Sequence, residues 1–480
     1  MALPCVRLCR RHSSAGLAVC GYSTVSRPSG PSGPQESSAP VFQYVGQHRK
    51  PTHKVFVWGF SFTGALGIPS FVVPDSGRKT PRKYQLTPYR LETEVEQISS
   101  AACGYGFTLM SSSTKDVTKV WGMGLNKDSQ LGFQRTQHSR HRSYDYVLEP
   151  SPVALPLKEP QLTRVLQVSC GRAHSLVLTD REGVFSMGNN SYGQCGRPIV
   201  EDEVFSGSHM IHNVDGLGGG RVKQVVCGQD HSLFLTHTGK VYACGWGADG
   251  QTGLGHHSIS PVPVEVGGDL AGVEVQQLSS YGDCSLAVSS DGRLFGWGNS
   301  EYRQLAPATE ETQVRWGAGG KKGTTRGQER RMYSVSFPQI NSPRHLPVRG
   351  CGKLLQAACG GTQVAVLNDE GEVFVWGYGI LGKGPKLTES STPEMIPPSL
   401  FGRSHFNPSV TVRRISCGLN HFAAITDRGE LFVWGKNIRG CLGIGKKDDQ
   451  YFPWRVTVPG QVVDVACGVD HMVALAKSVL

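Results

Sequence analysis

One short pattern occurs seven times along the chain, and it is out of step with itself at the two ends. Its first half is a Cys-Gly-x-x-His-like unit that leads into apolar residues, as in residues 170–178. Its second half is an apolar strand that ends in Gly and continues into a Gly-rich tail. The chain begins with a second half, residues 55–59, and finishes with a first half, residues 467–475. Seven whole units therefore form only if the two ends of the chain combine.

The spacing between the two halves is nearly constant. From the Gly of each first half to the Gly of the next second half, the steps are 18, 17, 17, 17, 17 and 17 residues. The first-half positions are Gly104, Gly171, Gly228, Tyr281 (a degenerate copy with Gly282 beside it), Gly360, Gly418 and Gly468. The strand-ending positions are Gly59, Gly122, Gly188, Gly245, Gly298, Gly377 and Gly435. Successive first-half positions lie about 50 to 80 residues apart, and repeats of this length indicate one repeat domain. A chain of 480 residues would otherwise suggest about three domains of about 150 residues.

The offset of the pattern predicts a closed ring. An open array would leave two bare sheet edges with unpaired backbone groups, whereas a circular array lets the N-terminal strand complete the C-terminal unit. We therefore predict an all-β fold over residues 54–476, a seven-bladed β-propeller in which the N- and C-terminal strands share the closing blade. The 61 glycines and 28 prolines suit many short strands joined by tight turns. No apolar run approaches the roughly 20 residues that a transmembrane helix needs.

Within one unit, the pattern predicts two strands and a tight turn before a third strand. Around Cys170, residues 165–170, 174–179 and 184–187 read as strands, and residues 180–183 as a turn. Asp and Gly recur at the equivalent turns because they tolerate the positive φ angles that tight hairpins require. The variable segments between units must supply the fourth strand.

Two segments lie outside the repeat. Residues 1–40 carry four arginines against one acidic residue and are rich in Ser, which is typical of a mitochondrial transit peptide followed by an unstructured linker. Simple disorder is the alternative. Residues 315–345 read as a flexible basic insertion within the propeller, which could be a partner-binding arm or an incidental insertion. We thus expect a mitochondrial protein, in the matrix or on the matrix side of the inner membrane.

The positive charge is concentrated in those segments. The formal net charge is +11, of which residues 1–40 carry +3 and residues 315–331 carry +5, so that +3 remains for the rest of the chain. Residues 78–83 and 135–142 form local basic loops. Solvated surface explains these loops; an acidic partner or RNA phosphates would be the functional explanation.

The Cys, His and Trp residues of the repeat are predicted to be structural. Equivalent cysteines lie one blade apart, too far for disulfide geometry, and no C-x-x-C pair suggests zinc. Four histidines share one position and read as hydrogen-bonded residues between adjacent strands, and five tryptophans read as packing between blades. The cysteines are Cys103, Cys170, Cys227, Cys359, Cys417 and Cys467; the histidines are His174, His231, His421 and His471; the tryptophans are Trp58, Trp121, Trp297, Trp376 and Trp434.

The sequence contains no grouping of nucleophile, base and orienting residue, so we predict no catalytic, cofactor-binding or metal-binding residues and no cofactor. Two G-x-G-x-x-G matches, at residues 245–250 and 377–382, belong to the seven-fold series and lack the following helix that a dinucleotide site requires. Residues 319–324 resemble a phosphate loop but lack its spacing. We expect a regulatory or binding protein rather than an enzyme.

The complete unit, seen at residues 170–196 and 227–253, resembles the repeat of the regulator of chromosome condensation (RCC) family. The resemblance covers about residues 54–476. Family members are seven-bladed propellers; the founding member is a guanine-nucleotide exchange factor for the GTPase Ran, and others are interaction platforms, so the fold alone does not settle activity. With its transit-like N-terminus, the chain is similar to a mitochondrial member of the family.

This resemblance implies two functions. The first is guanine-nucleotide exchange on, or binding to, a mitochondrial GTPase, such as the inner-membrane dynamin-like fusion GTPase, with peripheral association at the inner membrane. The second is a matrix scaffold in assembly of the large mitochondrial ribosomal subunit, which binds ribosomal RNA and assembly factors during RNA maturation. The basic loops of the first two blades are the sequence feature that favours the second function.

Overall fold

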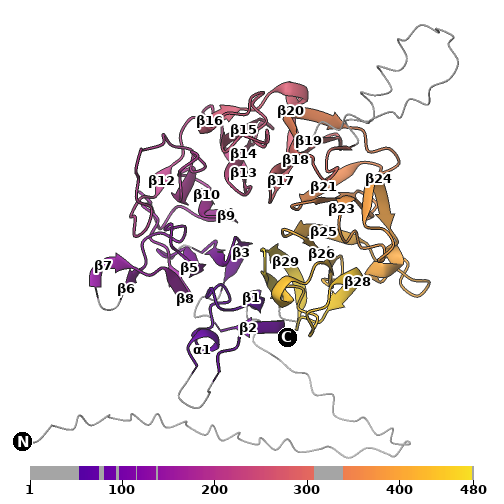
Figure 1. Ribbon diagram of the computed structural model, residues 1–480, viewed down its shortest axis with the longest axis horizontal. Coiled ribbons are helices and arrows are strands. Elements are labelled where there is room, and N and C mark those ends of the chain that lie inside the picture. The colour runs from indigo at the N-terminus through magenta and orange to yellow at the C-terminus, as the bar shows by residue number, and fades with distance from the viewer. Residues whose placement is uncertain are drawn as a thin grey trace, which may run out of the picture. The chain divides into compact units, whose positions relative to one another are not determined.

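In the part of the chain that the structure describes, the strands of the propeller account for nearly all regular structure. The computed structural model describes residues 53–74, 80–92, 97–114, 116–136, 139–306 and 339–477. The strands form seven four-stranded antiparallel sheets, which we number blades 1 to 7, and Figure 1 shows them arranged around a ring. Among the described residues the helical elements are short: α1 (Pro69–Val72), η1 (Gly268–Leu270), η2 (Pro398–Phe401) and η3 (Ile438–Gly440). The predicted seven-bladed all-β propeller is confirmed.

Each blade runs from an inner strand beside the central channel to an outer strand at the rim (Figure 1). Blade 1 contains β3 (Ile98–Cys103), β4 (Phe107–Ser112), β5 (Val120–Leu125) and β8 (Tyr146–Pro152). Blade 2 contains β9 (Val165–Cys170), β10 (His174–Thr179), β11 (Val184–Gly188) and β12 (His212–Asn213). Blade 3 contains β13 (Val222–Cys227), β14 (His231–Thr236), β15 (Val241–Gly245) and β16 (Ser260–Glu265).

The other four blades follow the same order. Blade 4 contains β17 (Val275–Ser280), β18 (Cys284–Ser289), β19 (Leu294–Asn299) and β20 (Gln339–Leu346). Blade 5 contains β21 (Leu354–Cys359), β22 (Gln363–Asn368), β23 (Val373–Tyr378) and β24 (Glu389–Ile396). Blade 6 contains β25 (Val412–Cys417), β26 (His421–Thr426), β27 (Leu431–Gly435) and β28 (Gln450–Val456). Blade 7 contains β29 (Gln461–Cys467) and β30 (His471–Lys477) together with β1 (His53–Phe60) and β2 (Tyr84–Leu91).

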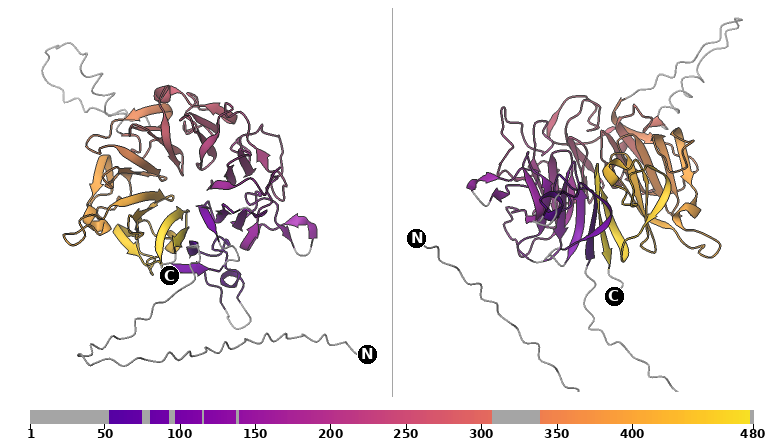
Figure 2. Two further views of the ribbon diagram at one scale, coloured as in Figure 1. Left: turned by 180° about the vertical axis from the view of Figure 1, so that it is seen from behind. Right: turned by 60° about the horizontal axis from the view of Figure 1, so that its bottom comes forward.

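Blade 7 closes the ring with strands from both ends of the chain. Its strand order is β2-β1-β30-β29, and β1 pairs with β30 over seven positions, from His53 opposite Lys477 to Gly59 opposite His471. Figure 2 shows these indigo and yellow strands side by side from two directions. The ladder satisfies the backbone groups that an open array would leave exposed, so the predicted shared closure is confirmed.

The tryptophans join neighbouring blades. Trp58, Trp297, Trp376 and Trp434 are fully buried. The first three also donate a hydrogen bond from Nε1 to a carbonyl of the preceding blade, at Cys441 (2.8 Å), Gln251 (2.9 Å) and Gln304 (2.8 Å). A buried indole removes a large apolar area from water, and the hydrogen bond satisfies its one polar group. The predicted packing of these tryptophans between blades is therefore confirmed.

A second set of contacts between blades lies on the inner strands. The amide of Gln224 donates to the Leu278 carbonyl and accepts from the Leu278 N–H, both at 2.9 Å, and so imitates a strand partner. The same two-way pairing joins Gln167 to Val225 and Gln277 to Ala357. Side chains thus link successive inner strands around the channel.

The repeat assignment in blade 1 needs a correction. In the six other blades the first residue of the second strand pairs with the strand-ending Gly, as His174 pairs with Gly188. In blade 1 Phe107 pairs with Gly124, not with the predicted Gly122. The hairpin between β4 and β5 is longer, which moves the register, and a Val-Trp-Gly sequence imitates the true end of the strand. Met123 therefore takes the buried tryptophan position, while Trp121 is only half-buried.

The predicted insertion also ends earlier than expected. Residues 339–345, the last part of the segment 315–345, form most of strand β20, which pairs with β19. The fourth strand of a blade has one face in solvent and a polar sequence, so it carries no strong repeat pattern. Residues 315–338 of that segment, like residues 1–40, lie outside the described residues.

Candidate interaction face and channel mouth

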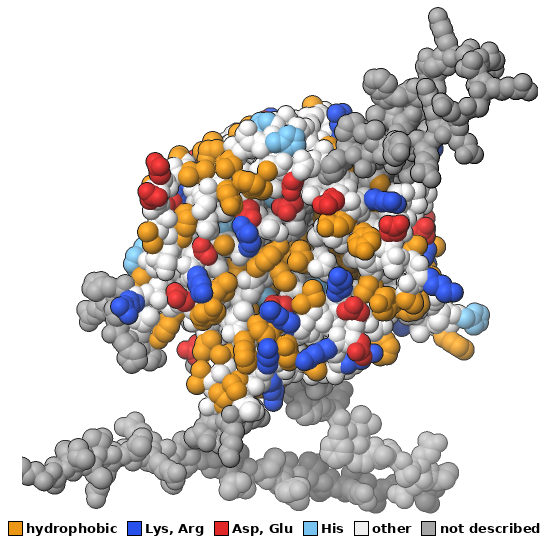
Figure 3. All heavy atoms as spheres, in the orientation of Figure 1, with side chains coloured by type: hydrophobic (Ala, Val, Ile, Leu, Met, Phe, Trp, Pro, Cys, Tyr) orange, Lys and Arg blue, Asp and Glu red, His pale blue; other side chains and the backbone are white. Residues whose placement is uncertain are grey.

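One face of the ring carries all the connections that vary most among blades. Because the strands alternate in direction, the Gly-x-x-His connection between the first and second strands emerges on the same side as the tail after the strand-ending Gly. We call this side the loop face; the tight Asp-Gly turns lie on the opposite side. Figure 3 looks onto the loop face, where basic, acidic and hydrophobic side chains are interspersed.

The repeat histidines lie at the seams between blades, at the edge of this face. His174 Nε2 lies 3.0 Å from Ser232 Oγ, His231 Nε2 lies 3.0 Å from Ser285 Oγ, and each hydroxyl belongs to the next blade. His471 Nε2 makes the same contact with Thr108 Oγ1 at 2.8 Å across the closing seam. These hydroxyls donate onward to backbone carbonyls of the histidine's own blade. The histidines are structural, as predicted, but they join neighbouring blades rather than strands within one blade.

His421 lacks this contact with the next blade. The position that holds Ser or Thr at the seams of the other three histidines is Met472 here, which has no hydroxyl, and His421 Nδ1 instead lies 3.7 Å from the Cys441 thiol. Its Nε2 atom has no hydrogen-bond partner. A histidine at this position therefore needs a Ser or Thr one blade further on to form the complete seam.

Burial sets the protonation of these histidines. It lowers the pKa of His174 and of His231 to about 3 and that of His421 to about 4, so all three are neutral. Burial also opposes the charged form of His471, but the Cys103 thiol and the Asp470 carboxylate, 3.5 Å from Nδ1, raise its pKa to about 10. The closing seam thus contains a charged imidazole with its own carboxylate.

Two tyrosines meet across the mouth of the central channel. Tyr281 of blade 4 stands where the other blades have Gly, and its ring stacks on Tyr105 of blade 1 with centroids 5.9 Å apart and planes inclined by 12°. Blades 1 and 4 are not neighbours, so the stacked pair spans the channel. The Tyr105 hydroxyl is 3.1 Å from Gln229 Oε1 of blade 3. The degenerate repeat position found in the sequence therefore places an aromatic ring across the mouth of the channel.

Charged groups surround this tyrosine pair. Arg172 pairs with Asp230 at 2.8 Å, and Asp283 accepts a hydrogen bond from Gln251 at 3.3 Å. Burial, followed by the carboxylates of Asp249 and Asp230, raises the pKa of Asp283 to about 6. Sequence reasoning missed this group because its members come from different blades and from positions that vary between repeats.

The cysteines are free thiols at the seams. Five of the six repeat cysteines are buried, Cys417 is half-buried, and none of the described cysteines forms a disulfide. Burial raises the pKa of Cys227 and of Cys417 to about 12, which keeps both protonated at neutral pH. This confirms their prediction as packing residues. Within the described ranges no group of three His, Cys, Asp or Glu side chains is arranged to hold a metal ion.

Blades 7, 1 and 2 carry extended connections on the loop face. After β1 the chain forms α1, whose Phe71 packs into the core shared with blade 1. After β5 it forms the hairpin of β6 (Arg135–Thr136) and β7 (Ser139–Ser143), which contains the predicted basic loop. After β11 it forms an irregular segment, residues 197–211, which we call the strap. These three additions follow one another around the ring (Figure 1).

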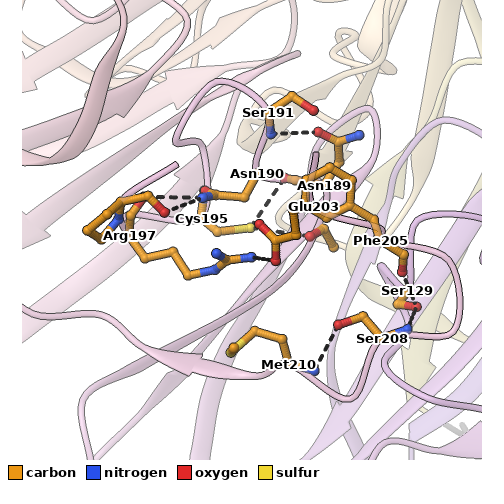
Figure 4. A network of polar contacts seen from close by, with 12 residues as sticks. Ser129, Asn189, Asn190, Ser191, Cys195, Arg197, Glu203, Phe205, Ser208 and Met210 are labelled. Carbon is orange, nitrogen blue, oxygen red and sulfur yellow. Dashed lines mark hydrogen bonds and ion pairs between the residues drawn. The ribbon is translucent and has the colours of Figure 1, made fainter. Parts of the chain in front are cut away.

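The strap is held at its base by a set of polar contacts (Figure 4). Arg197 forms a largely buried ion pair with Glu203, so the strap folds back on itself. Asn190 donates to the carbonyls of Arg197 and Pro198, each at 3.2 Å. Ser129 of blade 1 donates to the Phe205 carbonyl at 2.7 Å and accepts from the Ser208 N–H at 2.9 Å. The strap is therefore fixed to both blade 2 and blade 1.

Comparison with known proteins gives the same architecture. The RCC1-like domain model matches residues 50–316, and models of the regulator of chromosome condensation repeat match residues 412–441 and 428–475. The chain belongs to the RCC1-repeat family. It is 66% identical over 449 residues to the mouse RCC1-like G exchanging factor-like protein (92% of this chain, 91% of the relative). The human protein of that name is 63% identical over 480 residues, covering 98% and 97% of the two chains.

Solved structures agree with this assignment. The crystal structure of human WBSCR16 has a TM-score of 0.79 at 65% identity, and covers 88% of this chain and 100% of that chain. Yeast Prp20p, at 18% identity and a TM-score of 0.67, covers 90% and 93% and shows that the fold is shared. Among the described residues, no helix is long and apolar enough to cross a membrane.

Proposed function

We propose that this propeller binds a GTPase through its loop face and accelerates the release of GDP. The observation that carries the proposal is the identity of 66% and 63%, over nearly the whole chain, to relatives named RCC1-like G exchanging factor-like protein. The structure adds a closed ring whose repeated hydrogen bonds lie at the seams between blades, with its irregular connections on one face. Such a platform suits binding rather than covalent catalysis.

The mechanism needs no reacting side chain. An exchange factor binds the nucleotide-free GTPase more tightly than the loaded form, and the difference in affinity shifts the GTPase toward release. The ring contributes rigidity, because its hydrogen-bonded seams hold the loop face in one conformation before the partner arrives. This lowers the entropy cost of association.

We further propose that the partner is a mitochondrial GTPase, such as the inner-membrane dynamin-like fusion GTPase. The support is the transit-like composition of residues 1–40, with four arginines against one acidic residue. The protein would then act in the matrix or peripherally on the matrix side of the inner membrane. Import into isolated mitochondria with removal of an N-terminal segment tests this location; a chain that stays outside and uncut would contradict it.

The test of exchange is release of fluorescent GDP from purified mitochondrial GTPases, with and without the chain lacking residues 1–40. We expect substoichiometric amounts to accelerate release from one GTPase of the panel. A panel in which no GTPase responds would refute exchange.

A basic and aromatic group on blades 6 and 7 supports a second candidate function, ribosomal RNA binding in assembly of the large mitochondrial ribosomal subunit. Lys447 lies 3.6 Å from the Tyr84 ring centroid, and Lys83 lies 5.5 Å from it and 5.9 Å from that of Phe62. Cations interleaved with aromatic rings suit single-stranded RNA. Association with ribosomal particles that disappears after RNase treatment would favour this function; association that persists would count against it.

A further inference from the structure

The connections that lead from one blade to the next lie on the side of the ring opposite the loop face. The longest of them joins β24 of blade 5 to β25 of blade 6 and spans residues 397–411. Phe406, in its second half, is 90% exposed, the highest value among the large hydrophobic residues that the structure describes. A single exposed apolar residue is common on a protein surface. The way this one is held makes it unusual.

Hydrogen bonds fix the turn that presents Phe406. Ser404 and Asn407 exchange backbone hydrogen bonds, at 3.3 and 3.0 Å, around the two residues at the tip. Arg403 Nε donates to a backbone carbonyl across the turn at 3.0 Å. Arg428 Nη1, from the tight hairpin of blade 6, donates to Asn407 Oδ1 at 2.9 Å. The turn is therefore preformed, and a partner that binds it loses little interaction energy in ordering it.

The two ends of the same connection are anchored in the core. Phe401 is buried, and its ring centroid lies 5.7 Å from that of Phe432 and 5.8 Å from that of Trp434, both in blade 6. Val410, at the other end, is also buried. Apolar contacts thus hold the connection on the ring, and Phe406 takes no part in them.

Positive charge flanks Phe406. Arg403 and Arg428 both bond to uncharged oxygens of the turn, so these bonds leave their charge without a counter-ion. Both carboxylates of the blade 6 hairpin have partners: Asp427 accepts a backbone N–H at 3.3 Å, and Glu430 pairs with an arginine of β28 at 2.9 Å. Aromatic and Arg side chains are the residues that most often dominate the affinity of a protein interface.

We propose that the turn of residues 403–408 binds a partner protein, with Phe406 inserted into an apolar pocket whose rim carries carboxylates. Arg403 and Arg428 then pair with that rim. The charge of the turn requires an acidic partner surface, and the rigid support suits a shaped pocket. This inference does not rest on the proposed exchange activity, because the turn lies on the side opposite the loop face.

The size of the apolar contact favours a protein over a membrane. Burying one phenyl ring strengthens binding by about tenfold to a hundredfold. A contact of this size suffices for the centre of a protein interface. It is too small to hold a chain on lipid, where even one long acyl chain gives only marginal binding. The neighbours of Phe406 in the turn, Ser404, His405 and Asn407, are polar and add no apolar area.

A photo-crosslinking residue in place of Phe406 tests the contact in the full chain in living cells. The probe is p-benzoylphenylalanine, which keeps the aromatic ring. The matched control position is Leu162, which is 53% exposed in the connection between blades 1 and 2 on the same side. We expect one discrete protein adduct from position 406 that position 162 does not give. Arg428→Gln should reduce its yield about fivefold or more and Arg428→Lys should preserve it, because Lys keeps the charge. The same adduct from both positions would refute the proposal.

Binding of the purified adduct protein to the full chain then decides the role of the ring. Phe406→Ser should weaken this binding about tenfold to a hundredfold and Leu162→Ser should leave it unchanged. The melting temperature of Phe406→Ser should equal that of the parent chain, because the exposed ring packs on nothing in the core. An affinity that Phe406→Ser does not change overturns the proposal. So does an adduct that consists only of lipid, or Phe406-dependent binding to vesicles of phosphatidylcholine and phosphatidylglycerol, since either result assigns the turn to a membrane.

Discussion

Acidification should destabilise the ring through its buried histidines. The pKa values of His174, His231 and His421 lie at about 3 to 4 in the folded protein because of burial, against about 6.5 in the unfolded chain. Between these values the unfolded chain binds more protons than the folded one, so stability is lost as the pH falls below about 6.5. From pH 7 to pH 5 the loss is about 2 kcal/mol for each histidine, or about 6 kcal/mol for three.

Two other buried groups act in the opposite direction. The pKa of His471 is raised to about 10, so this side chain is already protonated in the folded protein at pH 7. Lowering the pH therefore costs no stability at this residue. The pKa of Asp283 is raised to about 6, so the folded protein takes up its proton before the unfolded chain does. Each group recovers about 1 kcal/mol between pH 7 and pH 5. The expected net loss of unfolding free energy from these groups is therefore about 4 kcal/mol.

Urea unfolding at pH 7 and pH 5, followed by tryptophan fluorescence, measures this loss. His231→Gln provides the decisive variant, because the chain itself places Gln363 at the equivalent position of blade 5. Its pH-dependent loss should be about 2 kcal/mol smaller than that of the parent chain, whatever the substitution does at pH 7. Replacing the exposed His237 by Gln should leave the loss unchanged. The reasoning is refuted if His231→Gln shows the same loss as the parent chain.

Three further predictions concern the architecture. Gly124→Ala should lower the unfolding free energy by about 3 kcal/mol or more, because Gly124 has φ of 106° and its added Cβ would lie 2.5 Å from a backbone oxygen. Gly122→Ala should lower it by about 1 kcal/mol, because the added Cβ would meet only the movable Leu131 side chain, at 2.9 Å. Equal thermal-shift losses for the two variants would contradict the corrected register. Gln224→Leu removes both hydrogen bonds to Leu278 and should cost about 2 to 3 kcal/mol in urea unfolding, and a neutral result would mean that water replaces them. Deleting residues 462–475 removes most of two strands of blade 7 and should abolish the cooperative melting transition; an unchanged melting curve would rule out shared closure.

The sequence predicts this fold well wherever a residue serves the repeat itself. Trp58 and His231 recur because every seam needs the same buried indole and the same hydrogen bond, and the offset of the repeat implies the closure at β1 and β30. The prediction of Gly122 is wrong because three additional hairpin residues move the register while a local Val-Trp-Gly imitates the strand end. Local pattern alone cannot detect such a shift; the pairing partner decides it.

The candidate site was not predictable for a different reason. Tyr105 and Tyr281 meet only because the ring brings blades 1 and 4 to opposite sides of one channel. Tyr281 is an exception to the repeat, and Tyr105 occupies a position that varies between repeats. The strap has no periodicity at all, and its support comes from Ser129, which lies 76 and 79 residues before its two partners in the chain. Contacts of this kind depend on closure of the whole ring, so they become visible only in three dimensions.

The contrast between residues that serve the repeat and residues that depart from it indicates which side chains can recognise a binding partner. In this propeller most of the repeated Trp, His and Gln side chains bond to the neighbouring blade and so are not free to recognise a partner. Recognition must then use residues that depart from the repeat. On the described part of the loop face these departures adjoin one another: α1 packs on blade 1, blade 1 carries the basic hairpin, and its Ser129 holds the strap of blade 2. A partner that contacts the strap would therefore also lie beside the basic hairpin, where Arg135 and Arg142 are exposed. Neutralising Arg135 and Arg142 should then weaken the binding of such a partner to this face, and unchanged binding would contradict a role of the hairpin in recognition.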